Sequence, residues 1–293
     1  RPVEGGEERW GQRLAAIAEE LGPTFIKLGQ LLSSRPDLLP PEWIADLSRL
    51  QDRVAPFPTD EACTIIRKEL HRDVRDLFAE FQAVPLASGS IAQTYLARTH
   101  DGRRVVLKVR RPGIEHVIKL DMHILRGLAV RAERAFPELR AHRPTSIVEE
   151  FALSLGRELD LINEATATHR IHQAFANHPH VVTPAILWDL TTSKVLTMTY
   201  VDGRPFTEAL ADPTLALDRS KLAYTLVDVF MIQFLELGVF HADPHPGNLL
   251  VMPPDRIGII DFGMAGQLES VRAAQIIILL TAHLLPLLFP SLW

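Results

Sequence analysis

The stretch 239-VFHADPHPGNLLV-251 concentrates polar residues between two apolar runs. Six of the eight residues from His241 to Asn248 are His, Asp, Pro or Asn, and a solvated loop does not need such crowding. His241, Asp243 and Asn248 fit the spacing H-x-D-x-x-x-x-N. In loops that transfer phosphoryl groups, the Asp orients or deprotonates the acceptor and the Asn holds a metal. This spacing therefore predicts Asp243 as a catalytic residue.

A second motif follows at a short distance along the chain. The apolar runs 249-LLV-251 and 257-IGII-260 predict a hairpin that ends in 261-DFG-263. Such a hairpin places Asp261 beside Asn248. Carboxylate and amide oxygens are the ligands that Mg²⁺ prefers, and they leave coordination sites for phosphate oxygens. Asn248 and Asp261 are therefore the predicted metal ligands.

A cation that can bridge phosphates is expected in 105-VVLKV-109. Strand alternation puts Lys108 on the face opposite Val105, Leu107 and Val109. A lysine in a buried strand needs a carboxylate partner. The pattern over 145–174 predicts one long helix that carries 158-ELDLINE-164, on which Asp160 and Glu164 share a face and Glu158 points elsewhere. One helix could thus serve two lysines.

The second lysine is Lys27 in 27-KLGQ-30. Helical periodicity predicts two short helices over 10–21 and 25–32, separated by a break at Gly22-Pro23. On the second helix Lys27, Gln30 and Ser34 form a polar strip.

The order of the elements indicates an α+β protein. Helices are also expected near 41–51, 59–70 and 113–135. Hairpins are expected over 91–109, where 100-HDGR-103 supplies the turn, and over 186–200. The net charge of −5 gives no basic footprint for nucleic acid. A single cysteine, Cys63, excludes an internal disulfide.

The ends of the sequence leave alternatives open. No signal peptide is recognisable. Residues 273–293 carry no Asp, Glu, Lys or Arg, a length near that of a bilayer span, but prolines interrupt the segment. It is interpreted as a buried helix, a membrane-contacting segment or an aberrant tail.

The combined motifs resemble the UbiB family, also called the AarF or ADCK family, of atypical protein-kinase-like proteins associated with ubiquinone and other isoprenoid lipids. The resemblance covers about residues 10–270. It rests on motifs that appear in the family's order: 27-KLGQ-30, 87-ASGS-90, Lys108, 158-ELD-160, Glu164, 241-HADPHPGN-248 and 261-DFG-263.

The resemblance implies a two-lobe protein-kinase-like fold with a helical N-terminal extension. The implied parts are the extension over 1–80, an N-lobe over 81–202 and an incomplete C-lobe over 203–293. No A-P-E element follows 261-DFG-263, so a conventional peptide-docking activation segment is not expected. Only 30 residues follow Gly263, which is the reason for expecting an incomplete lobe.

The resemblance also assigns roles to residues. Lys108 would bind the nucleotide and pair with Glu164, while Lys27 and Gln30 in the extension would lie over the active site with Lys27 near Glu158. The small-residue loop would replace the kinase glycine-rich loop, and a hinge strand would face the adenine. The implied nucleotide-binding residues are Ala87, Ser88, Gly89, Ser90, Lys108, Met198, Tyr200 and Val201.

The expected activity is ATP hydrolysis or phosphoryl transfer with ATP and Mg²⁺ as cofactors. The expected acceptor is a small or lipid-related molecule, and expected partners include a membrane surface and lipid-biosynthesis proteins, with no nucleic acid. The expected location is the cytoplasm, with association to the inner face of a membrane as an option. Two alternatives stay open: an inactive ATP-dependent scaffold, and a hydrolase in which His241, Asp243 and His245 bind zinc.

Overall fold

The computed structural model describes residues 8–50, 54–241, 246–263 and 265–267. Contacts divide the chain into two compact units, one formed by residues 1–161 and 188–197 and the other by residues 162–187 and 198–293. Neither unit is a continuous stretch of sequence, because the chain passes from one to the other three times. The two units are described separately.

Three helices open the first unit: α1 (Glu8–Leu21), α2 (Pro23–Ser33) and α3 (Pro41–Leu47). The break between α1 and α2 is set by Gly22, whose φ of 100° suits glycine, and by Pro23 in the first turn of α2. A cluster of buried apolar residues, Ala18, Ile26, Leu47 and Leu50, joins the three helices. The predicted pair of short helices is confirmed.

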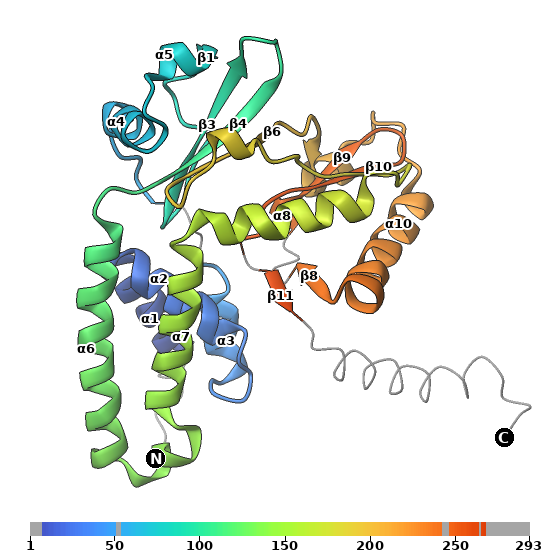
Figure 1. Cartoon of the computed structure of the whole chain (residues 1–293). Helices are drawn as coiled ribbons and strands as arrows, with labels where there is room; N and C mark the ends of the chain where they lie inside the picture. Colours follow the sequence, from blue (N-terminus) through green and yellow to red (C-terminus); the bar gives the residue numbers. More distant parts are fainter. Residues whose placement is uncertain (1–7, 51–53, 242–245, 264, 268–293) are drawn as a thin grey trace, which may run out of the picture. The chain divides into compact units, whose positions relative to one another are not determined.

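A twisted sheet forms the rest of the first unit's framework (Figure 1). Its strands are β1 (Phe78–Phe81), β2 (Ala87–Ser88), β3 (Ala92–Thr99), β4 (Arg104–Arg110) and β6 (Val195–Thr199). Strands β1, β3, β4 and β6 are adjacent in that order, and β2 pairs with β3. Gly102, at a φ of 88°, turns the chain between β3 and β4, so the hairpin predicted around 100–103 is confirmed.

Helices α4 (Thr59–Leu70) and α5 (Val74–Leu77) precede β1. Two longer helices, α6 (Ile114–Ala135) and α7 (Pro144–Glu158), lie side by side and are joined by the 3₁₀ helix η1 (Pro137–His142), as Figure 1 shows. Their facing sides form an apolar cluster that also includes Ile91. Phe25, Leu28 and Leu31 of α2 pack against this cluster, so α2 and the helix pair share one core.

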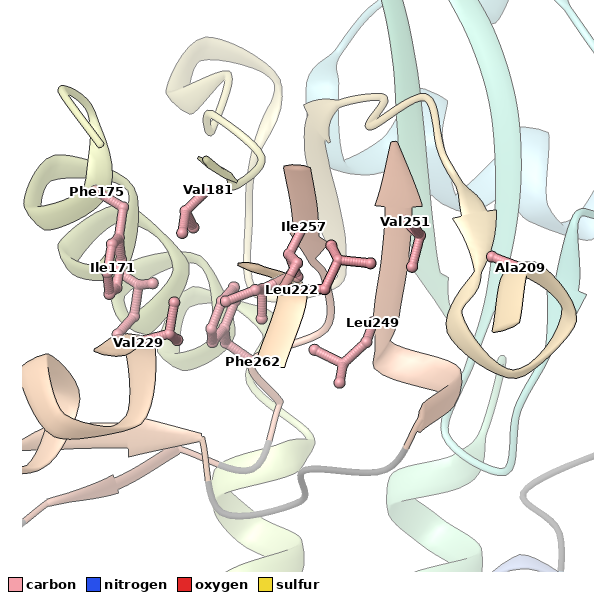
Figure 2. Packing of buried hydrophobic residues seen from close by; sticks show 11 residues of the cluster. Ile171, Phe175, Val181, Ala209, Leu222, Val229, Leu249, Val251, Ile257 and Phe262 are labelled. Carbon is pink, nitrogen blue, oxygen red and sulfur yellow. The ribbon is translucent and has the colours of Figure 1, made fainter. Parts of the chain in front are cut away.

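The second unit is built around a four-stranded sheet. Its strands, in spatial order, are β5 (Val181–Val182), β10 (Arg256–Ile259), β9 (Leu249–Met252) and β7 (Arg204–Pro205). Helices α8 (Leu161–Phe175), α9 (Phe206–Ala211) and α10 (Arg219–Ile232) accompany this sheet. The core joins α8, α10 and the sheet, and Phe262 lies among its side chains near Leu222, Ile171 and Val229 (Figure 2).

Short elements complete the second unit. The π-helical turn η3 (Gln233–Leu237) follows α10, and β8 (Val239–His241) pairs with β11 (Ala265–Gln267). The 3₁₀ turn η4 (Pro246–Asn248) leads directly into β9. Strands β9 and β10 pair antiparallel with Leu249 opposite Ile259, which confirms the predicted hairpin before 261-DFG-263.

Two predicted elements were wrong. The single helix over 145–174 is two helices, α7 and α8, with Asp160 between them. The carbonyl of Leu159 accepts a bond from the Arg110 guanidinium at 2.6 Å, and the amide of Leu161 donates to Ser193 at 3.1 Å. These two partners replace hydrogen bonds that a continuous helix would make within itself. Asp160 therefore lies outside both helices, and the prediction that it shares a helix face with Glu164 was also wrong.

The second predicted hairpin is present only in part. Strand β6 forms over Val195–Thr199, but the segment 186–190 contributes one isolated bridge, from Ile186 to Met198, and the 3₁₀ turn η2 (Trp188–Leu190). The predicted division into three parts, with boundaries at 80 and 202, stays a prediction. The two compact units have their boundaries after residues 161, 187 and 197. No helix within the described ranges is both long and apolar enough to cross a membrane.

Candidate functional site

The 261-DFG-263 turn in the second unit brings two carboxylates to one glycine. Asp261 has a φ of 61°, a left-handed conformation that is uncommon for residues other than glycine. One of its carboxylate oxygens accepts the Gly263 amide at 3.0 Å. A Cβ added to Gly263 would lie 3.1 Å from that Asp261 oxygen and 3.5 Å from a carboxylate oxygen of Glu164. The lack of a side chain at Gly263 therefore lets both carboxylates approach.

Phe262 fixes this turn in place. Its side chain is 1% exposed and belongs to the apolar core of the second unit (Figure 2). Glu164 is 6% exposed although it carries an ionisable group. Burial of a carboxylate is costly unless hydrogen bonds or cations compensate it, and two acidic groups near one residue increase that need. The arrangement is typical of a site that takes up cationic groups.

Asn248 lies next to the same turn through the backbone. Its carbonyl accepts the amide of Ile260, the residue before Asp261, at 2.9 Å. The predicted adjacency of Asn248 and Asp261 across the hairpin is therefore present. An amide oxygen and a carboxylate fit the donor preferences of Mg²⁺, so these residues are suitable for that ion.

Lys108 occupies the predicted face of β4 in the first unit. Val105, Leu107 and Val109 are fully buried, whereas Val106 and Lys108 are half-buried on the other face. Lys108 lies opposite Thr94 of β3. On the other side of β3, Thr94 pairs with Ala87 of β2, the first strand of the small-residue hairpin. The alternation predicted from the sequence is confirmed, while the nucleotide-binding role of Lys108 stays a prediction.

The small residues 87–90 form the tight end of a second hairpin on the same sheet. Ala87 and Ser88 form β2 and pair with Thr94 and Gln93. The Gly89 amide donates to the Ala92 carbonyl at 2.9 Å, and Ser90 at the turn is fully buried. The predicted loop is thus the short connection between β2 and β3, closed by a backbone hydrogen bond.

The extension residues Lys27 and Gln30 are anchored within the first unit. The Lys27 ammonium lies 3.0 Å from the Glu158 carboxylate at the end of α7, which is the proximity that the family resemblance implied. The Gln30 side-chain amide donates to the Leu50 carbonyl at 3.2 Å. Between them, Gly29 gives α2 a close approach to the segment after α3, because a Cβ there would lie 2.4 Å from a methyl of Leu50.

The predicted hinge residues fall in and just after β6. Met198 and Val201 are 9% and 5% exposed, and Tyr200 is half-buried. Val201 packs against the β9–β10 hairpin, where an added Cβ on Gly258 would lie 2.8 Å from a Val201 methyl. These positions are mostly apolar and at least half-buried. Whether they face adenine stays a prediction.

Asp243 and His245 lie outside the described residues, and only the backbone of His241 is described. The catalytic role of Asp243 and the alternative zinc set are therefore untested predictions. Among the described side chains, no group of three or more His, Cys, Asp or Glu residues could hold a metal ion.

Comparison with known proteins agrees with these motifs. A model of the ABC1 atypical kinase-like domain matches residues 49–285. The chain belongs to this family. The ABC1 assignment confirms the resemblance and the kinase-like α+β fold predicted from the sequence. The helices α1–α3 lie N-terminal to the matched range.

Relatives of the ABC1 chain come from plants and bacteria. It is 39% identical over 265 residues to the chloroplastic protein Activity of BC1 complex kinase 3 of Arabidopsis thaliana, covering 90% of the chain and 37% of that protein. It is 41% identical over 262 residues to the probable protein kinase UbiB of Marinobacter nauticus, covering 88% and 48%. The chain thus spans between about a third and a half of these relatives.

A solved structure shares the fold. The complex of Rv3197 with erythromycin from Mycobacterium tuberculosis superposes with a TM-score of 0.62 at 25% sequence identity. The superposition covers 89% of the chain described here and 66% of the Rv3197 chain.

Two residues that organise the small-residue hairpin lie outside the motifs recognised in the sequence. Gln93 is fully buried beside β2, and Arg111 follows β4. Arg111 belongs to 103-RRVVLKVRR-111, where its charge resembles that of its neighbours. Only the contacts in the fold distinguish it from them.

Proposed function

We propose that this ABC1 chain binds ATP with Mg²⁺ and either hydrolyses it slowly or transfers its phosphoryl group to a small or lipid-related acceptor. The observation that carries the proposal is the 261-DFG-263 turn, where the carboxylates of Asp261 and Glu164 both approach Gly263. Kinase-like proteins use such a turn to hold a metal against nucleotide phosphates. The family assignment supports the same chemistry.

The proposed roles follow the chemistry of each side chain. Lys108 neutralises charge on the α- and β-phosphates, and Glu164 orients cationic groups through its buried carboxylate. Asn248 and Asp261 supply oxygen ligands for Mg²⁺, which when bound offsets the negative charge of the phosphates. Asp243 orients water or an acceptor hydroxyl and accepts its proton. Lys27, Gln30 and Glu158 hold the extension in place.

The proposed acceptor is small rather than a protein. In the resembled family the extension folds over the active site, and such a cover hinders the entry of a folded protein substrate. The Lys27–Glu158 ion pair and the shared apolar core around α2 are consistent with a firmly held extension.

The proposed setting is the biosynthesis of ubiquinone or another isoprenoid lipid. The support is similarity to proteins named UbiB, at 41% identity in two bacterial relatives. Partners in this setting would be a lipid-related acceptor, other lipid-biosynthesis proteins and the cytoplasmic face of a membrane.

Thermal unfolding with Mg²⁺ and ATP, ADP or no nucleotide tests the proposal. A ligand present at 100 times its dissociation constant stabilises a protein by about 2.7 kcal/mol, which is readily measured as a shift in Tm. We expect the shift to require both Mg²⁺ and Asp261, so Asp261→Ala should abolish it. Asp228→Ala is the matched control, because Asp228 is exposed in the same unit and pairs with His178.

The other outcomes separate the alternatives. A nucleotide shift without any turnover of ATP would favour the inactive scaffold over the enzyme. Stabilisation by zinc, together with no response to ATP, would contradict the proposal and favour the hydrolase.

A further inference from the structure

Arg111 joins two segments of the first unit that are far apart in the sequence. Its Nε donates to the carbonyl of Gly89 at 2.7 Å, and one terminal nitrogen donates to the Ser88 hydroxyl at 2.7 Å. The same nitrogen reaches the carbonyls of Ala55 at 2.9 Å and Val54 at 3.4 Å. One guanidinium therefore connects the small-residue hairpin with the segment 54–57, which we call the strap.

Gln93 makes a second connection to the strap. Its side-chain oxygen accepts the Phe57 amide at 3.0 Å, and its side-chain nitrogen donates to the Phe57 carbonyl at 3.2 Å. The Val54 amide donates to the Ser88 carbonyl at 3.1 Å. The strap is thus bonded to the hairpin at both of its ends, and the Arg111 guanidinium also lies 5.5 Å from the centre of the Phe57 ring.

The contacts use two nitrogens of the guanidinium. Nε donates to one neutral acceptor, the Gly89 carbonyl, and one terminal nitrogen serves the other three. A guanidinium presents five N–H donors in a fixed plane and also stacks on aromatic rings. A lysine carries the same charge on a single nitrogen and cannot reproduce this pattern.

The hairpin turn shares an apolar cluster with α2. Ile91, at this turn, belongs to the cluster of α6 and α7 against which Phe25 and Leu28 of α2 also pack. The Arg111 amide donates to the Ile91 carbonyl at 2.8 Å. The same arginine therefore holds the turn that shares an apolar cluster with α2, the helix that carries Lys27.

We propose that Arg111 is a positioning residue, which holds the 87–90 hairpin and the strap as one body and thereby couples nucleotide binding at the hairpin to the N-terminal helices. This inference rests on the proposed function, because it assumes that the small-residue hairpin contacts the nucleotide. Arg111 lies outside the motifs from which the nucleotide site is predicted.

Two substitutions at this position separate shape from charge. Arg111→Ala removes the guanidinium, and Arg111→Lys keeps the charge without the fork of donors. Both should weaken MgATP binding, by about tenfold as judged from the loss of several charge-assisted hydrogen bonds. Arg98→Ala is the matched control, because Arg98 is an exposed arginine on β3 that pairs with Glu80. The control should bind MgATP like the unmodified chain.

Hydrogen exchange reports the coupling itself. In the unmodified chain, MgATP should slow exchange at the amides of Val54 and Phe57, which are bonded to Ser88 and Gln93. This response should be lost in both Arg111 variants, along with the affinity for MgATP noted above. A role in stability alone would lower Tm but leave the MgATP affinity and the exchange response unchanged.

Two results would overturn the coupling while nucleotide binding itself stands. They are an unchanged MgATP affinity and exchange response in Arg111→Ala, or equal losses in Arg98→Ala. Full recovery by Arg111→Lys would overturn the requirement for a guanidinium and assign the effect to the positive charge. If Arg111→Ala does not fold, Phe57→Leu removes the ring contact at a half-buried position and is judged by the same two measurements. Failure of the unmodified chain to bind MgATP would instead reject the proposed function, and the coupling with it.

Discussion

The Lys27 ammonium and the Glu158 carboxylate lie 3.0 Å apart, and the two side chains are only 14% and 13% exposed. The pair links α2 to the last residue of α7. Water screens such a pair far less than it screens an exposed one, so loss of one partner leaves a poorly compensated charge.

Lys27→Ala should therefore destabilise the protein by about 2–4 kcal/mol in denaturant unfolding. Arg126→Ala, which removes an exposed pair with Glu149 on the neighbouring helices, should change stability little. A double-mutant cycle with Glu158→Gln isolates the pair. A coupling energy near zero would show that the proximity does not stabilise the fold.

The Gly29 position should not accept a side chain. Gly29→Ala places a methyl 2.4 Å from Leu50, which is 5% exposed and has little room to move. We expect a loss of about 1–3 kcal/mol, the usual result of overpacking a core. Gly156→Ala is the control, because nothing lies within 4 Å of its added Cβ. It should stabilise α7 by up to about 1 kcal/mol, and equal effects at the two sites would contradict the close packing of α2.

The Glu69–Lys194 pair should make stability depend on acidic pH. Burial alone would raise the pKa of Glu69, but hydrogen bonds from Lys194 and Thr192 outweigh it and hold this pKa below its ordinary value of 4.5. The stabilisation is thus fully present above pH 4.5 and is lost as pH falls through the lower pKa of the folded state. The Tm difference between the unmodified chain and Glu69→Gln should be constant from neutral pH to about pH 5 and shrink below 4.5.

Lys194→Met provides the control for this pH dependence. It removes the cation that lies 2.7 Å from Glu69 and should give a Tm difference that shrinks over the same pH range. A difference that grows on acidification would have the wrong sign for a lowered pKa.

Phe262 should contribute more to stability than its neighbours in the turn. Phe262→Ala leaves a cavity in the core of the second unit and should cost about 3–5 kcal/mol. Phe262→Leu retains most of the volume and should cost clearly less. Denaturant unfolding measures both, and similar small losses would show that the turn is not anchored by this ring.

Lys108 and Asp243 should affect different steps. Lys108→Ala should weaken MgATP binding, because Lys108 is proposed to neutralise the phosphates. Asp243→Asn should leave binding intact and lower turnover by about 10²–10⁴-fold, the usual contribution of an acid or base catalyst. Calorimetry and phosphate release measure the two effects. An equal loss of affinity in both variants would contradict the assigned roles.

The elements predicted correctly from the sequence are those with strong local signals. The Gly22-Pro23 break, the turn at Gly102 and the hairpin before 261-DFG-263 each depend on residues with fixed backbone preferences. The alternating burial around Lys108 follows from strand geometry alone.

The errors occur where distant contacts replace local bonds. No strong helix breaker marks the end of α7, since neither Pro nor Gly follows Leu159 directly. The helix ends where Arg110 takes the Leu159 carbonyl and Ser193 takes the Leu161 amide. The contacts of Arg111 were also not predictable, because three of the four acceptors described are backbone carbonyls, which every residue carries.

The passage of the chain between units has a consequence for synthesis on the ribosome. Strand β6 borders β4 in the first sheet, but residues 162–187 of the other unit are translated before it. This sheet therefore cannot be completed until Thr199 has emerged, and no single cleavage point releases either unit whole. A truncation that keeps one unit intact would remove part of the other. We therefore expect the two units to occur together in natural proteins and in gene fusions.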